Sequence, residues 1–148
     1  MQPHALQFIP QEDLRIFHEI VGIVGLLPDI ILGHTKTGRE VPISCHVLTR
    51  ALASIFETLE VKDGFIGYGS HYEHSWLQTS SGSIIDPYPF ATVGGPIILA
   101  DVLFWRSFYG PEICLIEHQQ EPFTAWVETI TNVVYEIYYN PKENKTAH

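Results

Sequence analysis

Three residues of this chain have side chains that could act together in nucleophilic chemistry. A cysteine, Cys45, is followed along the chain by His74 and then by Asp86. The thiolate form of a cysteine is the nucleophile, and it forms when a neighbouring base takes the thiol proton. An imidazole can act as that base, and a carboxylate beside it fixes the imidazole tautomer and stabilises the imidazolium. These are the residue types that a cysteine nucleophile requires, provided that the fold brings them together.

Cys45 lies where the sequence predicts the start of a helix. Ser44 is a good N-cap residue, and the apolar residues within 44–59 recur with helical spacing. The unpaired N–H groups and the dipole at a helix N-terminus stabilise an anion and thereby lower the pKa of a thiol. The alternative is that Cys45 is a small buried apolar residue without a chemical role.

Two short segments rich in aromatic and β-branched residues, 72–79 and 84–88, predict a β-hairpin that joins His74 to Asp86. Gly82 supplies the positive φ that a short hairpin loop needs. If Gly82 faces position 78, His74 directly faces Asp86, with Cβ atoms about 4.5–5.5 Å apart on one face of the sheet. Two alternatives stay open: a surface His–Asp pair without function, or a one-residue slip that puts the two side chains on opposite faces.

The order of these residues and their immediate neighbours resemble a known family. His74 is followed by a serine and a tryptophan, and Asp86 is followed by a proline. A cysteine at a helix start, then a strand with this histidine, then a strand with this aspartate is similar to the transglutaminase-like branch of the papain-like cysteine enzymes. Bacterial transglutaminase-core proteins and arylamine acyltransferases share this order. The resemblance covers about residues 40–90.

The resemblance implies a role for each residue. Cys45 would be the nucleophile, His74 the general base and later the acid, and Asp86 the residue that orients His74, with no cofactor. The reaction would pass through a thioester on Cys45. Its acceptor would be water in a peptidase, amidase or deamidase, or an amine in a transglutaminase or acyltransferase. The substrate would be a peptide, a protein side-chain amide or a small amide.

The same resemblance implies an oxyanion hole made by the backbone N–H of Cys45 and a second donor. His34 and Thr35 are candidates for the second donor, because they lie in a polar, glycine-bounded loop upstream of Cys45. Trp76 is on the same predicted strand face as His74. It would either line the substrate cleft or pack in the core.

The remaining pattern predicts one α+β domain over residues 1–148. Helices are expected at 11–27 and 44–59, and a closing helix is expected to begin with Pro122. Residues 97–109 are apolar enough for a buried strand or a short helix, and 140–148 are expected to form a flexible tail. Short strands are expected at 65–68, 72–79 and 84–88. Helices followed by an antiparallel sheet and a closing helix predict an α+β fold. The resemblance narrows this to a papain-like, transglutaminase-like arrangement, with the nucleophile at a helix start packed on the sheet.

A metal site is the main chemical alternative, because the chain has eight histidines. His71 and His74, however, are three residues apart, which on a strand places them on opposite faces. Neither an H-E-x-x-H motif nor a paired C-x-x-C motif occurs. We therefore expect no metal. His46 either borders the site or is solvated, and Cys114, in an apolar run, is expected to be a buried structural residue.

A protein of another class could also carry these residues, namely a non-catalytic interaction or regulatory module that retains the fold. The acidic composition favours this alternative, since 17 acidic and 8 basic side chains give the 148 residues a formal charge of −9. Such a chain is long enough for one domain with a core and too acidic for a nucleic-acid binder. Without a visible secretory signal, a long apolar run or enough cysteines for a disulfide scaffold, it is expected to be cytoplasmic, with no membrane partner. The oligomeric state stays open.

Overall fold

The computed structural model describes residues 9–27, 44–67, 72–88, 95–106, 108–111 and 120–140 of the chain. Within these residues, three helices accompany one five-stranded antiparallel sheet, so the fold is α+β, as the sequence predicts. In chain order the elements are α2 (Gln11–Gly25), α3 (Cys45–Ile55), β1 (Glu60–Ile66), β2 (Tyr72–Gln78), β3 (Ile84–Asp86), β4 (Ile97–Leu99), β5 (Tyr109–Pro111) and α4 (Phe123–Tyr139).

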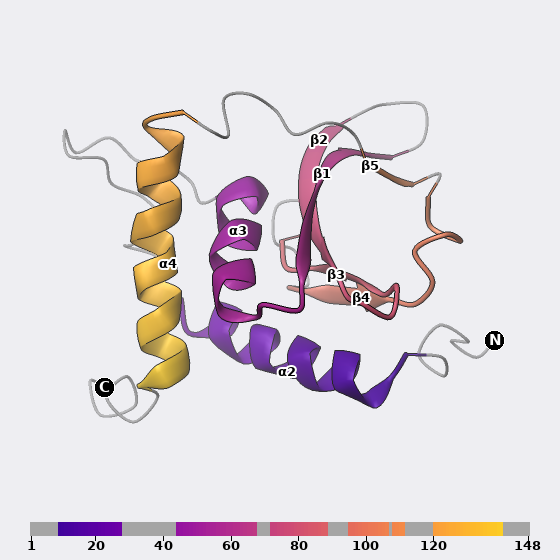
Figure 1. Cartoon of the computed structure of the whole chain (residues 1–148), viewed down its shortest axis with the longest axis horizontal. Helices are drawn as coiled ribbons and strands as arrows, with labels where there is room; N and C mark the ends of the chain where they lie inside the picture. Colours follow the sequence, from indigo (N-terminus) through magenta and orange to yellow (C-terminus); the bar gives the residue numbers. More distant parts are fainter. Residues whose placement is uncertain are drawn as a thin grey trace.

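The helices gather on one side of the sheet. Figure 1 shows α3 between α4 and the strands, with α2 running across the lower end of α3. Each helix buries a stripe of apolar residues spaced three or four positions apart, which is the pattern of a helix with one face in a core. Ile20 of α2, Leu52 of α3 and Val134 of α4 are completely buried in the same core cluster. None of the described helices is long and apolar enough to cross a bilayer.

The sheet has the strand order β4-β3-β2-β1-β5, so β2 lies at its centre. Strand β2 pairs with β1 along its full length, from Glu60 opposite Gln78 to Ile66 opposite Tyr72. Its pairing with β3 is much shorter and consists of Leu77 opposite Ile85 and Gln78 opposite Ile84. The part of β2 that carries His74 is therefore held in register by β1.

The two faces of the sheet belong to different clusters. Leu77 and Ile85 pack into the large core shared with the helices. Trp76 and Ile84, one residue earlier on each strand, pack with Tyr109 in a second cluster. Because side chains alternate along a strand, His74 points to the face of Trp76 and the neighbouring serine points to the helices.

The hairpin between β2 and β3 is closed by a short loop with Gly82 at φ 93°. The N–H of Thr79 donates to the carbonyl of Ser83 at 2.9 Å. The hydroxyls of Thr79 and Ser83 both donate to one carboxylate oxygen of Asp13, each at 2.8 Å. Asp13, which is buried in the first turn of α2, thus fixes the loop to the helical layer.

The predicted hairpin register is wrong by two residues. The prediction placed Gly82 opposite position 78, whereas the structure places Ile84 there. Gly82 lies inside the loop that Thr79 and Ser83 close, so it has no strand partner. A shift of two residues preserves the face of every side chain, unlike a shift of one. His74 and Asp86 therefore still share a face, as diagonal neighbours that long side chains can bridge.

Several predicted boundaries also change. The helix expected over 44–59 ends earlier, at Ile55. The strand expected at 65–68 begins earlier, because β1 already pairs with β2 from Glu60 onward and this pairing requires extended backbone. The apolar stretch 97–109 holds strand β4 at its start and enters strand β5 at its end. The closing helix begins at Phe123, with Pro122 as its N-cap residue. Residues 141–148 of the expected tail lie outside the described residues.

Candidate active site

Cys45 is the first residue of α3. Ser44 before it is the N-cap, with extended backbone, and its Oγ accepts a hydrogen bond from the N–H of Val47 at 3.2 Å. The predicted helix start is therefore present. Cys45 is only 9% exposed. Its thiol stands at the electropositive end of a helix and is largely shielded from water.

Two imidazoles lie near the thiol and influence its charge. Burial raises the pKa of Cys45, but hydrogen bonds to His46 and His74, together with their positive charge, lower it to about 6. A hydrogen-bonding cation favours the ionised form of a thiol, whereas an apolar surrounding disfavours it. Here the two histidines outweigh the burial, so Cys45 is a thiolate at neutral pH.

His74 connects the thiol to a carboxylate. Its Nε2 lies 2.8 Å from Oδ2 of Asp86, which leaves Nδ1 for the hydrogen bond with Cys45. Burial lowers the pKa of His74, but Asp86 and the Cys45 thiolate raise it to about 9. Between about pH 6 and about pH 9 the two side chains therefore form a thiolate–imidazolium pair.

Asp86 is completely buried and is held from several directions. The hydroxyl of Tyr109 donates to Oδ2 at 2.7 Å, and the N–H of Tyr88 donates to Oδ1 at 3.2 Å. Burial raises the pKa of Tyr109, and the charge of Asp86 raises it further, so this hydroxyl keeps its proton. With His74, these donors satisfy the hydrogen-bonding capacity of the buried carboxylate.

A second relay reaches the thiol from the helix side of β2. Nδ1 of His46 lies 2.6 Å from Oγ of Ser75, and that hydroxyl donates to Oδ1 of Asp63 at 2.5 Å. Arg50 donates to the other oxygen of Asp63 at 2.6 Å. The hydroxyl has a single proton, and it donates this proton in the hydrogen bond to Asp63. It can therefore only accept from His46, whose Nδ1 is the donor. Its Nε2 is then the nitrogen that meets Cys45.

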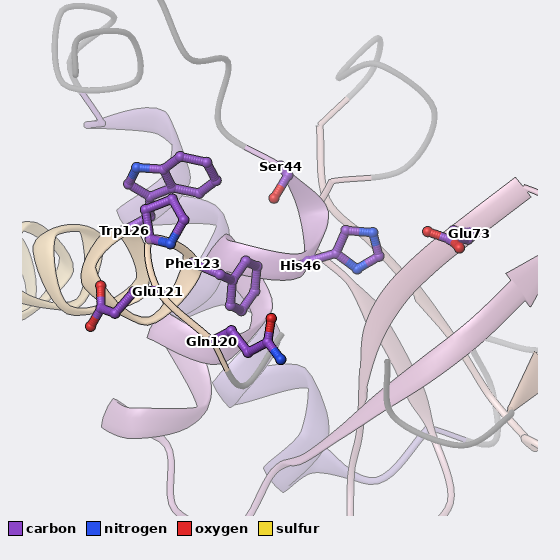
Figure 2. Close-up of a pocket in the computed structure, with 8 residues that line it drawn as sticks. Ser44, His46, Glu73, Gln120, Glu121, Phe123 and Trp126 are labelled. Atoms are coloured by element: carbon purple, nitrogen blue, oxygen red, sulfur yellow. The ribbon is translucent and has the colours of Figure 1, made fainter. Parts of the chain in front are cut away.

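Beside the thiol lies a pocket of about 340 Å³. It is lined by Ser44, His46, Glu73, Gln120, Glu121, Pro122, Phe123 and Trp126. Figure 2 shows Glu73 and His46 on one side, facing Phe123, Gln120, Glu121 and Trp126 on the other. The residues before and after Cys45 both line this space, although Cys45 itself does not, so the pocket lies close to the chain segment that carries the nucleophile.

The structure brings together Cys45, His74 and Asp86, but not the other residues that the sequence offered. Trp76 is completely buried beneath His74, with the two rings stacked at 6.3 Å, and its Nε1 finds no hydrogen-bond partner among the described residues. It therefore supports the site and does not line the cleft. His34 and Thr35, proposed as oxyanion donors, lie outside the described residues, as does Cys114.

Sequence reasoning missed several residues that hold the site. Tyr109 contacts Asp86 from β5, and no local motif around it signals this contact. The link from Ser75 to Asp63 follows from β1 and β2 register, which places the two residues directly opposite each other. The sequence does not decide whether His46 borders the site or is solvated, although its place in the first helical turn after Cys45 favours the site.

Within the described residues, no group of three or more His, Cys, Asp or Glu side chains is arranged to hold a metal ion. Comparisons of the chain with protein-family models, with curated proteins and with solved structures gave no match. The geometry around Cys45 is therefore the basis on which a function can be assigned.

Proposed function

We propose that this protein is a cysteine-dependent acyl-transfer enzyme of papain-like, transglutaminase-like type, which forms a thioester on Cys45. The observation that carries the proposal is the thiolate–imidazolium pair of Cys45 and His74, with Asp86 behind the imidazole. A nucleophile, a base within contact and a third group that orients the base are the geometric signature of covalent catalysis.

In the first step, the Cys45 thiolate attacks the carbonyl carbon of an amide and forms the new C–S bond. The imidazolium of His74 then gives its Nδ1 proton to the amide nitrogen as the C–N bond breaks and the amine leaves. Asp86 keeps its hydrogen bond to Nε2 throughout and stabilises the imidazolium before this transfer. The product of this step is a thioester on Cys45 and a neutral His74.

In the second step, neutral His74 takes a proton from the acyl acceptor, which attacks the thioester carbonyl. The C–S bond breaks, the acyl group leaves on the acceptor, and the thiolate–imidazolium pair is restored. Water as acceptor gives a peptidase, amidase or deamidase, and an amine gives an acyltransferase. The substrates proposed are a peptide, a protein side-chain amide or a small amide.

The position of Cys45 at the start of α3 supports stabilisation of the tetrahedral intermediate. The first N–H groups of a helix have no acceptor within that helix, and the N–H of Cys45 belongs to this set. An oxyanion formed at the attacked carbonyl would therefore meet a backbone donor and the positive end of the helix dipole.

The proposal can be tested with p-nitrophenyl acetate, an activated ester that acylates nucleophilic cysteines. Mixing with the protein at neutral pH should release one equivalent of p-nitrophenol in a burst and leave an acetyl group on Cys45, found by mass spectrometry. His74→Ala should slow hydrolysis of the acetyl group from Cys45, the step in which His74 takes a proton from water, by about 10²–10⁴-fold, the usual contribution of a general acid–base, and Cys45→Ser should abolish the burst. A protein that shows neither burst nor adduct would favour the non-catalytic interaction module.

A further inference from the structure

We propose that the pocket beside Cys45 binds the cationic side chain of a lysine or arginine in a peptide substrate. This inference rests on the proposed function, because it assigns a substrate group to the same site. It goes further by naming the residue type that would adjoin the bond under attack.

The location of the pocket relates its occupant to the reacting bond. Ser44 and His46 line the pocket, and Cys45 lies between them in the chain. Cys45 itself does not line the pocket, so an acyl group attached to the thiol would begin near this space rather than inside it. A side chain that fills the pocket would therefore belong to a residue close to the scissile bond.

Apart from His46, which interacts with Cys45 and Ser75, the titratable side chains that line the pocket are acidic. Glu73 from β2 and Glu121 from the segment before α4 line it, and the lining includes no lysine or arginine. Both glutamates are exposed, and neither forms a salt bridge within the described part of the chain. Glu121 accepts a hydrogen bond from the hydroxyl of Thr124 at 2.7 Å. Two carboxylates without a paired cation among the described residues are complementary to a cationic ligand.

Arg50, a cation close to the pocket lining, is already paired with a carboxylate. The guanidinium of Arg50 stands 5.5 Å from the centre of the Phe123 ring, which lines the pocket. However, Arg50 forms a salt bridge with Asp63 at 2.6 Å, so it contributes little net charge to the pocket. The formal charge of −9 on the whole chain adds to the attraction of cations at longer range.

The apolar part of the pocket matches the rest of a lysine or arginine side chain. Phe123 and Trp126 form one wall, opposite Glu73 (Figure 2). Aromatic surface can cover the aliphatic stem of these side chains and also attracts the cation through its ring faces. A volume of about 340 Å³ is at the lower end of ligand pockets, which suits one long side chain.

Charge selectivity at the thiol gives a direct test. Cys45 is modified with two methanethiosulfonates of similar size, one carrying trimethylammonium and the other sulfonate, and the ratio of the two rate constants is measured. In Glu73→Gln/Glu121→Gln this ratio should fall about fivefold to twentyfold, since each of the two exposed charges changes the encounter rate of either ion about 1.5- to 2-fold, in opposite directions for the two reagents. The control, Glu57→Gln/Glu128→Gln, has the same net charge but alters exposed glutamates outside the pocket, and should change the ratio much less.

A substrate-level test uses p-nitrophenyl esters of N-acetyl-lysine and N-acetyl-norleucine, whose side chains differ mainly in the ammonium group. The wild-type protein should acylate about tenfold faster with the lysine ester, and the advantage should shrink in the pocket variant but persist in the control. Fast acylation without a preference for lysine, or an equal loss in both variants, would overturn the pocket assignment alone. Failure of both esters to acylate Cys45 would instead overturn the proposed function, while the methanethiosulfonate ratio would still decide the charge preference of the pocket.

Discussion

Replacing His74 with alanine should raise the pKa of the Cys45 thiol from about 6 to between about 7 and about 9. The variant loses a hydrogen bond and a positive charge that stabilise the thiolate, while the burial that raises this pKa persists. His46 still contacts the thiol, so part of the stabilisation should remain. The chain offers a matched control in His18→Ala, because His18 is an exposed residue of α2.

The rate at one pH is a poor measure of this change. If the pKa rises from about 6 to about 8, the thiolate fraction at pH 7 falls about tenfold. A thiolate of higher pKa is also more nucleophilic, and with a Brønsted coefficient of about 0.45 the same change raises its intrinsic reactivity about eightfold. The two effects nearly cancel at neutral pH. The midpoint of the pH–rate curve is therefore the quantity to compare.

The assay is alkylation by iodoacetamide from about pH 4 to about pH 10, a range that brackets both thiol midpoints. Mass spectrometry of the peptide that contains Cys45 separates its reaction from that of Cys114. Wild type and His18→Ala should show a midpoint near pH 6, His74→Ala a clearly higher one, and Asp86→Asn an intermediate value. An unchanged midpoint in His74→Ala would refute the thiolate–imidazolium pair.

The remaining predictions concern the groups that hold the site and its dependence on pH. Asp13→Ala should lower the free energy of unfolding in urea by about 2–4 kcal/mol, because two buried hydroxyls lose their acceptor, whereas the exposed neighbour Glu12→Ala should hardly change it. Arg50→Met should cost about 3–5 kcal/mol in the same assay by removing the cation that forms a salt bridge with the buried carboxylate of Asp63, and adding Asp63→Asn should restore part of the loss. Tyr109→Phe should cost about 1–3 kcal/mol and leave a measurable burst of p-nitrophenol. Acylation by p-nitrophenyl acetate should fall below about pH 6 as the thiolate is protonated, whereas cleavage of a peptide p-nitroanilide should also fall above about pH 9, because its leaving amine needs the imidazolium proton.

The parts of the site that the sequence predicts depend on local rules. An N-cap serine next to an apolar helical repeat locates Cys45, because capping and periodicity act within a few residues. Alternation along a strand assigns His74 and Asp86 to one face even though the predicted register is wrong by two residues. The face of the sheet on which a side chain lies depends only on whether the register shift is even or odd. The face can therefore be predicted more reliably than the register itself.

The remaining contacts depend on tertiary packing and leave no local pattern. Asp13 fixes the hairpin loop from a helix about 70 residues away in the chain, and Tyr109 reaches Asp86 from another strand. From the sequence alone, Asp13 is predicted only to be an acidic residue in the first turn of a helix. Its buried position follows from how α2 lies across the sheet, which single-sequence patterns do not determine.

Strand β2 separates two proton networks that meet at one thiol. His74 belongs to the network on one face, and Ser75, the next residue, to the network on the other. Inserting or deleting a single residue in β2 would exchange the two faces, so the imidazole would turn toward Asp63 and the hydroxyl toward Asp86. Such a change would disconnect both hydrogen-bond networks while leaving the amino-acid composition of the chain almost unchanged. The long ladder with β1 therefore protects the chemistry of Cys45 as well as the fold.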